Sequence, residues 1–252
     1  MLDELKKCRD RINALVPSEK LDQMWVGTPA DKWFESLKTS WKIESLPTSS
    51  LNRNGLLALV ADTKQSSNFS KDQIQKLIIS IFSWGGMSRT RTTGQLAMDS
   101  METYVEICRS LLLGSDPVES YQSFYNKQIA GSMRGVGPAY YTKLIFFLGD
   151  QKGLIMDQWT ARSMNILLKE PIIKLEGGYK GRFAVSKFNS QIVYKNYLEA
   201  LNELTKELGI SDASKTEELI FSCSHEQAKI KTLLGEFHED CSAWRRYVVA
   251  NS

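Results

Sequence analysis

Apolar residues recur every three to four positions along most of this 252-residue chain, a period that predicts amphipathic α-helices. The pattern places helices at residues 2–16, 52–63, 71–82, 99–113, 120–132, 140–148, 158–168, 190–208, 216–223 and 226–248. Residues 171–188 follow no helical period and predict a small hairpin or an irregular loop. We therefore expect an all-α fold with little or no sheet.

A glycine-rich turn separates the helices predicted at 120–132 and 140–148, with Gly135, Val136, Gly137 and Pro138 in sequence. Glycine tolerates φ > 0 and proline suits a first helical turn, so one helix ends here and the next begins. The glycines let the backbone approach a ligand closely, and the second helix offers free N–H groups and the positive end of its dipole. This arrangement suits a phosphate, although a helix–helix corner also uses glycine for packing.

Asp157 follows this turn and stands directly before the helix predicted at 158–168. A Gly-x-Gly hairpin followed by an Asp that opens a helix resembles the helix–hairpin–helix (HhH-GPD) superfamily of DNA glycosylases. The detail, Gly-Val-Gly-Pro-Ala-Tyr-Tyr-Thr-Lys and then Met-Asp-Gln-Trp-Thr-Ala-Arg, is most similar to a bacterial branch labelled as 8-oxoguanine-glycosylase-like. The resemblance covers residues 70–222 and is specific over 133–163. It implies a two-lobed helical fold with the active site between the lobes.

The resemblance implies that Asp157 is the catalytic carboxylate. Breaking an N-glycosidic bond builds positive charge on the sugar, so an ionised carboxylate beneath C1′ stabilises the transition state. The same carboxylate can orient or deprotonate water. An Asp in this position is also a preferred N-cap, and the two roles are compatible because capping holds the carboxylate in place.

The sequence indicates the nucleophile less clearly than the catalytic carboxylate. Relatives that form a covalent intermediate carry a lysine two residues after the last hairpin glycine, where this chain has Ala139. This departure predicts a monofunctional enzyme that uses water and leaves an abasic site. Lys143, one helical turn further on, is the alternative nucleophile, since burial can lower the pKa of a lysine into a reactive range. We interpret it first as a phosphate contact or a structural residue.

A second glycine-rich stretch, residues 84–94, carries several hydroxyl groups and two arginines. A glycosylase has to fill the space that a flipped nucleotide leaves and to hold the bent backbone. Trp84 and Met87 are candidates for a wedge or for the lining of the base pocket, and Arg89 and Arg91 for phosphate contacts. The alternative is an exposed flexible loop with Trp84 packed in the core.

Trp159, two residues after Asp157, is a further candidate to stack on an extruded base. Most of the other aromatic residues have helical spacing and are expected in the core. Trp159 is the one among them that we expect to face the cleft.

The net charge of +3 is too small to indicate nucleic-acid binding, but the charge is unevenly distributed. Residues 120–182 contain nine Lys or Arg and four Asp or Glu, which gives +5 and leaves −2 on the rest. A basic band around the hairpin is consistent with phosphate contacts from Arg134 and from the backbone of Gly135, Val136 and Gly137. A solvated face would have the same composition.

The sequence offers little support for a metal or a cofactor. Cys8, Cys108, Cys223 and Cys241 are expected to be reduced thiols of a cytoplasmic protein. Cys223 and Cys241 lie near His225 and His238, but this spacing is not a standard zinc pattern, and a helix between the pairs would hold them apart. We expect no metal and no other cofactor, apart from a monovalent or divalent cation at the hairpin. No signal peptide and no membrane-spanning run are recognised.

These observations predict three segments: N-terminal helices at 1–70 that pack with the C-terminal lobe, a helix–hairpin–helix lobe with Asp157 at 71–170, and the rest of the second lobe at 171–252. We expect a monomer that binds double-stranded DNA, flips out a modified base and hydrolyses its N-glycosidic bond. The family label suggests oxidised guanine in repair. Related proteins of antiviral defence suggest a bulkier base of phage DNA, such as glucosylated hydroxymethylcytosine. The alternatives are a non-catalytic DNA-binding protein with the same hairpin and a helical protein-interaction module.

Overall fold

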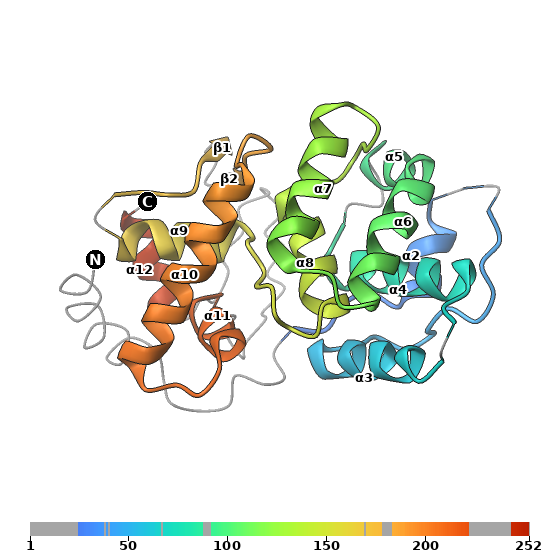
Figure 1. The fold of residues 1–252 in the computed structure, drawn as a ribbon, viewed down its shortest axis with the longest axis horizontal. Coiled ribbons are helices and arrows are strands. Elements are labelled where there is room, and N and C mark those ends of the chain that lie inside the picture. Colours follow the sequence, from blue (N-terminus) through green and yellow to red (C-terminus); the bar gives the residue numbers. More distant parts are fainter. Residues whose placement is uncertain are drawn as a thin grey trace, which may run out of the picture.

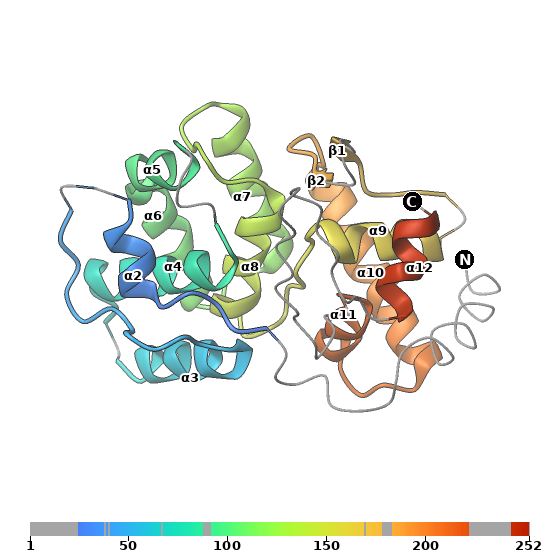
Figure 2. The same cartoon turned by 180° about the vertical axis from the view of Figure 1, so that it is seen from behind.

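The computed structural model describes residues 25–37, 39, 41–66, 68–87, 92–168, 170–177, 183–221 and 243–251, arranged in two lobes (Figures 1 and 2). The N-terminal lobe contains α2 (Ala30–Glu35), α3 (Arg53–Lys64), α4 (Lys71–Trp84), α5 (Thr92–Asp99), α6 (Met101–Leu112), α7 (Pro117–Ile129) and α8 (Pro138–Leu148). The C-terminal lobe contains α9 (Gln158–Leu167), β1 (Leu175–Gly177), β2 (Phe183–Val185), α10 (Gln191–Leu208), α11 (Ala213–Phe221) and α12 (Ala243–Asn251). The predicted all-α class is confirmed. The antiparallel pair β1–β2 occupies the stretch for which we predicted a hairpin or a loop.

Side-chain caps set where several helices begin. The Ser70 hydroxyl accepts a hydrogen bond from the Gln73 N–H, and the Gln73 side chain accepts one from the Ser70 N–H, which starts α4. Asn52 accepts from the Gly55 N–H at the start of α3. Asp116 caps α7 in the same manner. These short polar side chains satisfy N–H groups that have no partner within the helix, so the boundaries follow directly from the sequence.

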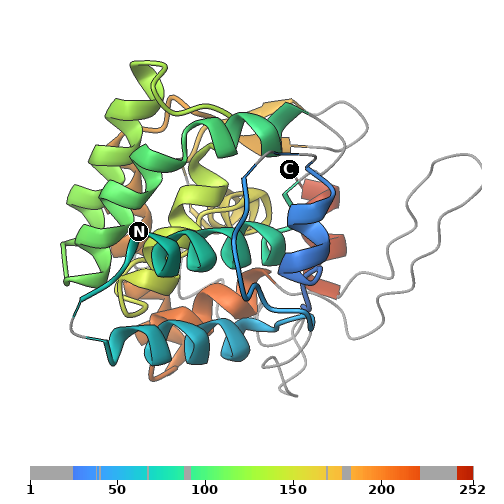
Figure 3. The ribbon, with the colours of Figure 1, turned by 90° about the vertical axis from the view of Figure 1, so that its right-hand side faces the viewer.

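Two central helices, α4 and α8, form the middle of the N-terminal lobe. The run from Leu144 to Leu148 is fully buried on every side of α8, as an all-apolar helix requires. Figure 3 shows α3 running beside α4, and α2 also packs against α4. α5 begins at the end of the glycine-rich stretch, continues beyond it, and was not expected as a helix.

Two predicted groupings of segments differ from the structure. We expected residues 1–70 to pack with the C-terminal lobe, but α2 and α3 pack against α4, and α3 also against α8. The reason is that the buried faces of α2 and α3, with Trp33 on the first and Leu56 and Val60 on the second, are covered by the N-terminal lobe. α9 was grouped with the hairpin lobe and instead packs against α11 and α12.

Residues 154–156 connect the two lobes and lead to Asp157 without helix or strand. The buried Tyr194 hydroxyl accepts from the Leu154 N–H at 3.1 Å and donates to the Leu154 carbonyl at 3.0 Å. The Tyr197 hydroxyl donates to the Ile155 carbonyl at 2.5 Å. Two tyrosines of α10 therefore supply the hydrogen bonds that a neighbouring strand would give to this backbone.

Replacing Tyr194 by Phe should lower the free energy of unfolding by about 2–3 kcal/mol, because both polar groups of Leu154 would lose their buried partner. Denaturant unfolding measures this change. The control is Tyr125→Phe on α7, a half-buried tyrosine with no hydrogen bond to residues 154–156, which should change stability by about 0.5 kcal/mol or less. Equal losses in the two variants would contradict the role assigned to Tyr194.

Candidate active site

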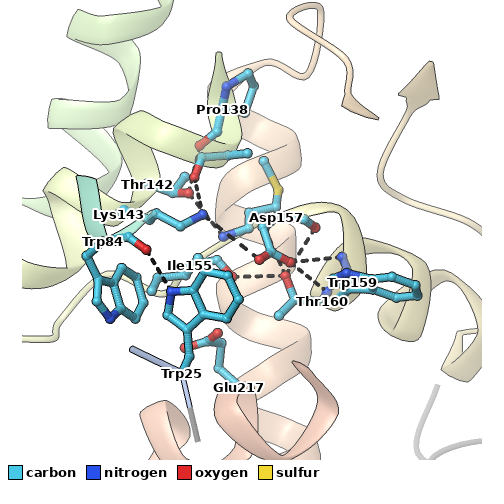
Figure 4. A network of polar contacts seen from close by, with 12 residues as sticks. Trp25, Trp84, Pro138, Thr142, Lys143, Ile155, Asp157, Trp159, Thr160 and Glu217 are labelled. Atoms are coloured by element: carbon cyan, nitrogen blue, oxygen red, sulfur yellow. Dashed lines mark hydrogen bonds and ion pairs between the residues drawn. The ribbon is translucent and has the colours of Figure 1, made fainter. Parts of the chain in front are cut away.

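Asp157 is the N-cap of α9, and its two carboxylate oxygens have different surroundings (Figure 4). Oδ1 accepts from the Trp159 N–H at 2.8 Å and from the Thr160 N–H at 3.1 Å. The Thr160 hydroxyl in turn accepts from the Asp157 N–H, which completes a capping box. Oδ2 points toward Lys143, with 3.9 Å between Oδ2 and Nζ. One oxygen thus fixes the carboxylate while the other faces a possible reaction partner.

Lys143 lies on α8. It reaches Asp157 because a hydrogen bond joins Thr142 and Met156, the residues directly before Lys143 and Asp157. The Thr142 hydroxyl accepts from the Met156 N–H at 3.1 Å and donates to the Pro138 carbonyl at 2.7 Å. The residues that follow Thr142 and Met156 are therefore held side by side. The Lys143 ammonium or amine donates to the Ala139 carbonyl at 2.8 Å, and its side chain is only 9% exposed.

Burial lowers the pKa of Lys143, although the negative charges of Asp157 and Glu217 act in the opposite direction. The charge state matters for chemistry at Asp157. An ammonium 3.9 Å away would offset much of the carboxylate charge, whereas a neutral amine leaves that charge available. The pair can thus offer a negative charge and an uncharged nucleophile at one place.

Glu217 of α11 and Arg53 of α3 form a second buried pair near the first, with 2.5 Å between Glu217 Oε2 and Arg53 Nη2. Their side chains are 2% and 13% exposed. Burial raises the pKa of Glu217 to about 7; Arg53 opposes this shift, and the negative charge of Asp157 adds to it. Neither Glu217 nor Arg53 was predicted from the sequence as part of the site. The only available signal was an acidic residue on the buried face of α11, which also carries Ser214 and Ile220.

The hairpin between α7 and α8 has the geometry expected for a close backbone approach. Gly135 has φ of +73°, and among the described residues no acceptor is found for the N–H groups of Gly135, Val136 and Gly137. The Val136 side chain is buried, so only its backbone can face a ligand. The Arg134 side chain is exposed beside the turn. These groups are arranged as an anion site requires.

The predicted base-contacting residues lie in different environments. Met87 is 2% exposed, and its carbonyl accepts from the Trp33 indole N–H. Trp84 is 8% exposed and packs edge-on against Phe147. Neither side chain protrudes as a wedge, because both belong to the core of the N-terminal lobe. Trp159 is half-buried.

The loop that follows α4 contributes to the site through Gly85 rather than through a wedge. A Cβ atom at Gly85 would lie 3.0 Å from the Lys143 Cδ and 3.3 Å from the Tyr140 ring. The absence of a side chain there gives Lys143 room to extend toward Asp157. The carbonyl of the preceding residue, Trp84, accepts from the indole N–H of the half-buried Trp25 (Figure 4).

Several predicted residues fall outside the described part of the chain. They are Arg89, Arg91, Cys8, Cys223, His225, His238 and Cys241. Cys108 is a buried free thiol. Among the described residues, no group of three or more metal-ligating side chains is found, and none of the helices has the length and apolar character to cross a membrane.

Replacing Gly135 by Ala should lower the free energy of unfolding more than replacing Gly131 by Ala. Both glycines have positive φ, of +73° and +75°, so each substitution costs about 1–2 kcal/mol in backbone strain. Only at Gly135 would the added Cβ meet another atom, the Thr93 carbonyl oxygen at 2.3 Å, whereas no atom lies within 4 Å at Gly131. Denaturant unfolding of the two variants isolates the contact between the hairpin and α5. Equal losses would show that α5 shifts to make room for the added Cβ without a cost in stability.

Comparisons with known proteins agree with this geometry. No curated protein and no solved structure matches the chain. A family model described as "Putative 8-oxoguanine DNA glycosylase OGG-like protein" matches residues 19–221, a range that includes the hairpin, Lys143, Asp157 and Glu217. The resemblance noted in the sequence is confirmed. The chain therefore belongs to this OGG-like family.

Proposed function

We propose that the protein is a DNA glycosylase that releases a modified base by means of Asp157. The observation that carries this proposal is the difference in surroundings between the two carboxylate oxygens of Asp157. Oδ1 is held by two backbone N–H groups of α9, and Oδ2 faces Lys143. A carboxylate held in this way does not rotate as charge develops in the transition state. It therefore stabilises positive charge on the sugar without reorganising.

The hairpin is the proposed grip on the DNA backbone. Its unpaired N–H groups and the N-terminus of α8 attract a phosphate without reading sequence. Arg134 adds a positive side chain at the same turn. Because α8 also carries Lys143, a phosphate held at the N-terminus of the helix fixes the strand relative to the reacting groups.

Lys143 is the proposed nucleophile. Ala139 at the usual lysine position predicts hydrolysis by water, but the burial of Lys143 and its 3.9 Å approach to Asp157 favour the amine. Its nitrogen would bond to C1′ as the bond between C1′ and the base breaks, and the base leaves with the bonding electron pair. The proton that the nitrogen loses would pass to Asp157 and from there to the departing base. Breaking the bond between C1′ and the ring oxygen, which takes a proton from solvent, then gives a Schiff base that permits strand cleavage; water as nucleophile does not.

Oxidised guanine is the proposed substrate, because the family description names 8-oxoguanine. A bulkier base such as glucosylated hydroxymethylcytosine in phage DNA is the second candidate and belongs in the same experiment. The proposed base pocket lies beside Asp157, with the half-buried Trp159 as its lining candidate. We also propose that the protein is a monomer and is located in the cytoplasm.

Asp157→Asn should reduce single-turnover base release by about 100-fold or more, since a neutral amide cannot offset the charge on the sugar. Asn is also a good N-cap, so the fold and DNA affinity should persist. The substrates are duplexes with 8-oxoguanine, uracil, or hydroxymethylcytosine with and without glucose, and alkaline cleavage reports abasic sites.

The matched control is Asp116→Asn, the same substitution at the N-cap of α7, which should leave base release unchanged. If wild type binds DNA in a salt-dependent manner but releases no base from any duplex, the proposal is wrong. A binding protein without catalysis then takes its place.

Borohydride reduction during turnover should trap wild type covalently on DNA, and Lys143→Gln should abolish this adduct. The control is Lys152→Gln, which removes an exposed lysine of the same segment and should leave trapping intact. Electrophoresis under denaturing conditions measures the adduct. Base release without an adduct and without strand breaks would show that water is the nucleophile, as Ala139 predicts.

A further inference from the structure

We propose that Glu217 is a positioning residue for this reaction: its ion pair with Arg53 holds the two lobes together next to Lys143 and Asp157 and cancels the buried positive charge of Arg53. This inference rests on the proposed function. It also states, independently of base release, that the Arg53–Glu217 pair sets the balance of charge near Lys143. The Arg53–Glu217 pair is not part of the hairpin or of the Asp157 cap. It acts on the reaction through other residues.

The position of the pair in the fold is the first argument. Arg53 is the first residue of α3 in the N-terminal lobe, and Glu217 lies on α11 in the C-terminal lobe. α3 packs against α8, which carries Lys143, and α11 packs against α9, which begins at Asp157. A contact between α3 and α11 therefore links the supports of both reacting groups, and Figure 4 shows Glu217 beside them.

The packing of Arg53 is the second argument. Its guanidinium lies 4.2 Å from the centroid of the Phe146 ring, and Phe146 is on α8, three residues after Lys143. Its other acidic neighbour, Glu218, is 3.9 Å away at Nη1. An arginine buried against an aromatic ring needs a compensating negative charge, and Glu217 at 2.5 Å supplies it.

Stability alone does not explain such a pair. The desolvation of two buried charges generally offsets most of their attraction, so an apolar pair of the same size would hold two helices as well. A buried acid and base next to a reactive centre are instead typical of groups that tune charge there. We therefore assign the pair an electrostatic role in addition to its contact between lobes.

Among the described residues, three charged side chains act on Lys143. Asp157 and Glu217 raise its pKa and Arg53 lowers it, so the contributions of the ion pair oppose each other. Tyr140 beneath the Lys143 side chain stays uncharged, because burial raises its pKa to about 12. Burial also raises the pKa of Tyr197 well above its usual value. Removing the charge of Glu217 would therefore leave Arg53 with only the more distant Glu218, so that much of its positive charge near Lys143 and the reacting sugar would be uncompensated.

The test compares Glu217→Gln with the double variant Arg53→Gln/Glu217→Gln, which removes both charges and keeps a hydrogen-bonding pair. Glu199→Gln, an exposed glutamate on α10, is the control. The first readout is the titration of the Lys143 side chain by ¹³C NMR, with its signal assigned by its absence in Lys143→Gln. The second is the pH profile of single-turnover base release, and thermal unfolding reports the stability of each variant.

Glu217→Gln should lower the Lys143 titration midpoint by about one pH unit and slow maximal base release by about tenfold. The double variant should return both values toward wild type, because it removes one positive and one negative charge together and leaves the net charge as in wild type. If the midpoint does not move in Glu217→Gln, or if the double variant is slower still, the pair acts only by holding the lobes and the inference is wrong. The NMR titration needs no activity, so it tests the charge balance even if wild type releases no base.

Discussion

The hydrogen bond between the Met156 N–H and the Thr142 hydroxyl is the contact on which the site depends. It joins the two lobes one residue before Asp157 and one residue before Lys143, so it sets the distance between these side chains. The segment 154–156 has no regular structure of its own. The Leu154 N–H and carbonyl, the Ile155 carbonyl and the Met156 N–H are hydrogen-bonded by buried hydroxyls from Tyr194, Tyr197, Thr160 and Thr142. The position of the carboxylate therefore relies on side chains rather than on a sheet or a continuous helix.

Much of the fold could be predicted from the sequence, because helix periodicity and capping residues are local signals. Ser70, Asn52 and Asp157 each stand where a helix begins. The Gly135 turn could be predicted for the same reason, since its positive φ favours glycine. The packing partners of α2 and α3 could not be predicted in this way. An amphipathic helix shows which face is buried, but it does not show which lobe covers that face.

The site was only partly predictable. Asp157 and the hairpin are close in sequence and form a recognisable pattern, whereas Arg53 and Glu217 are 164 residues apart and carry no spacing signal. Trp84 and Met87 illustrate a different limit, because a tryptophan or methionine next to glycines fits a surface wedge and a core position equally well. Met87 lies against α2, where Trp33 donates to its carbonyl, and the Trp84 ring packs against Phe147 of α8. The function of Gly85, which gives Lys143 its space, is visible only once α4 and α8 are placed together.

The burial of Lys143 and Asp157 also constrains how DNA can enter. Their side chains are 9% and 13% exposed, so only a small part of either is open to a sugar. A phosphodiester brings negative charge, which would raise the pKa of Lys143 and favour the unreactive ammonium. The amine stays neutral only if the flipped nucleotide excludes water as fully as the protein side chains do now. A close fit of the base is therefore a condition for reactivity as well as for binding, and a poorly fitting base would leave Lys143 solvated and protonated.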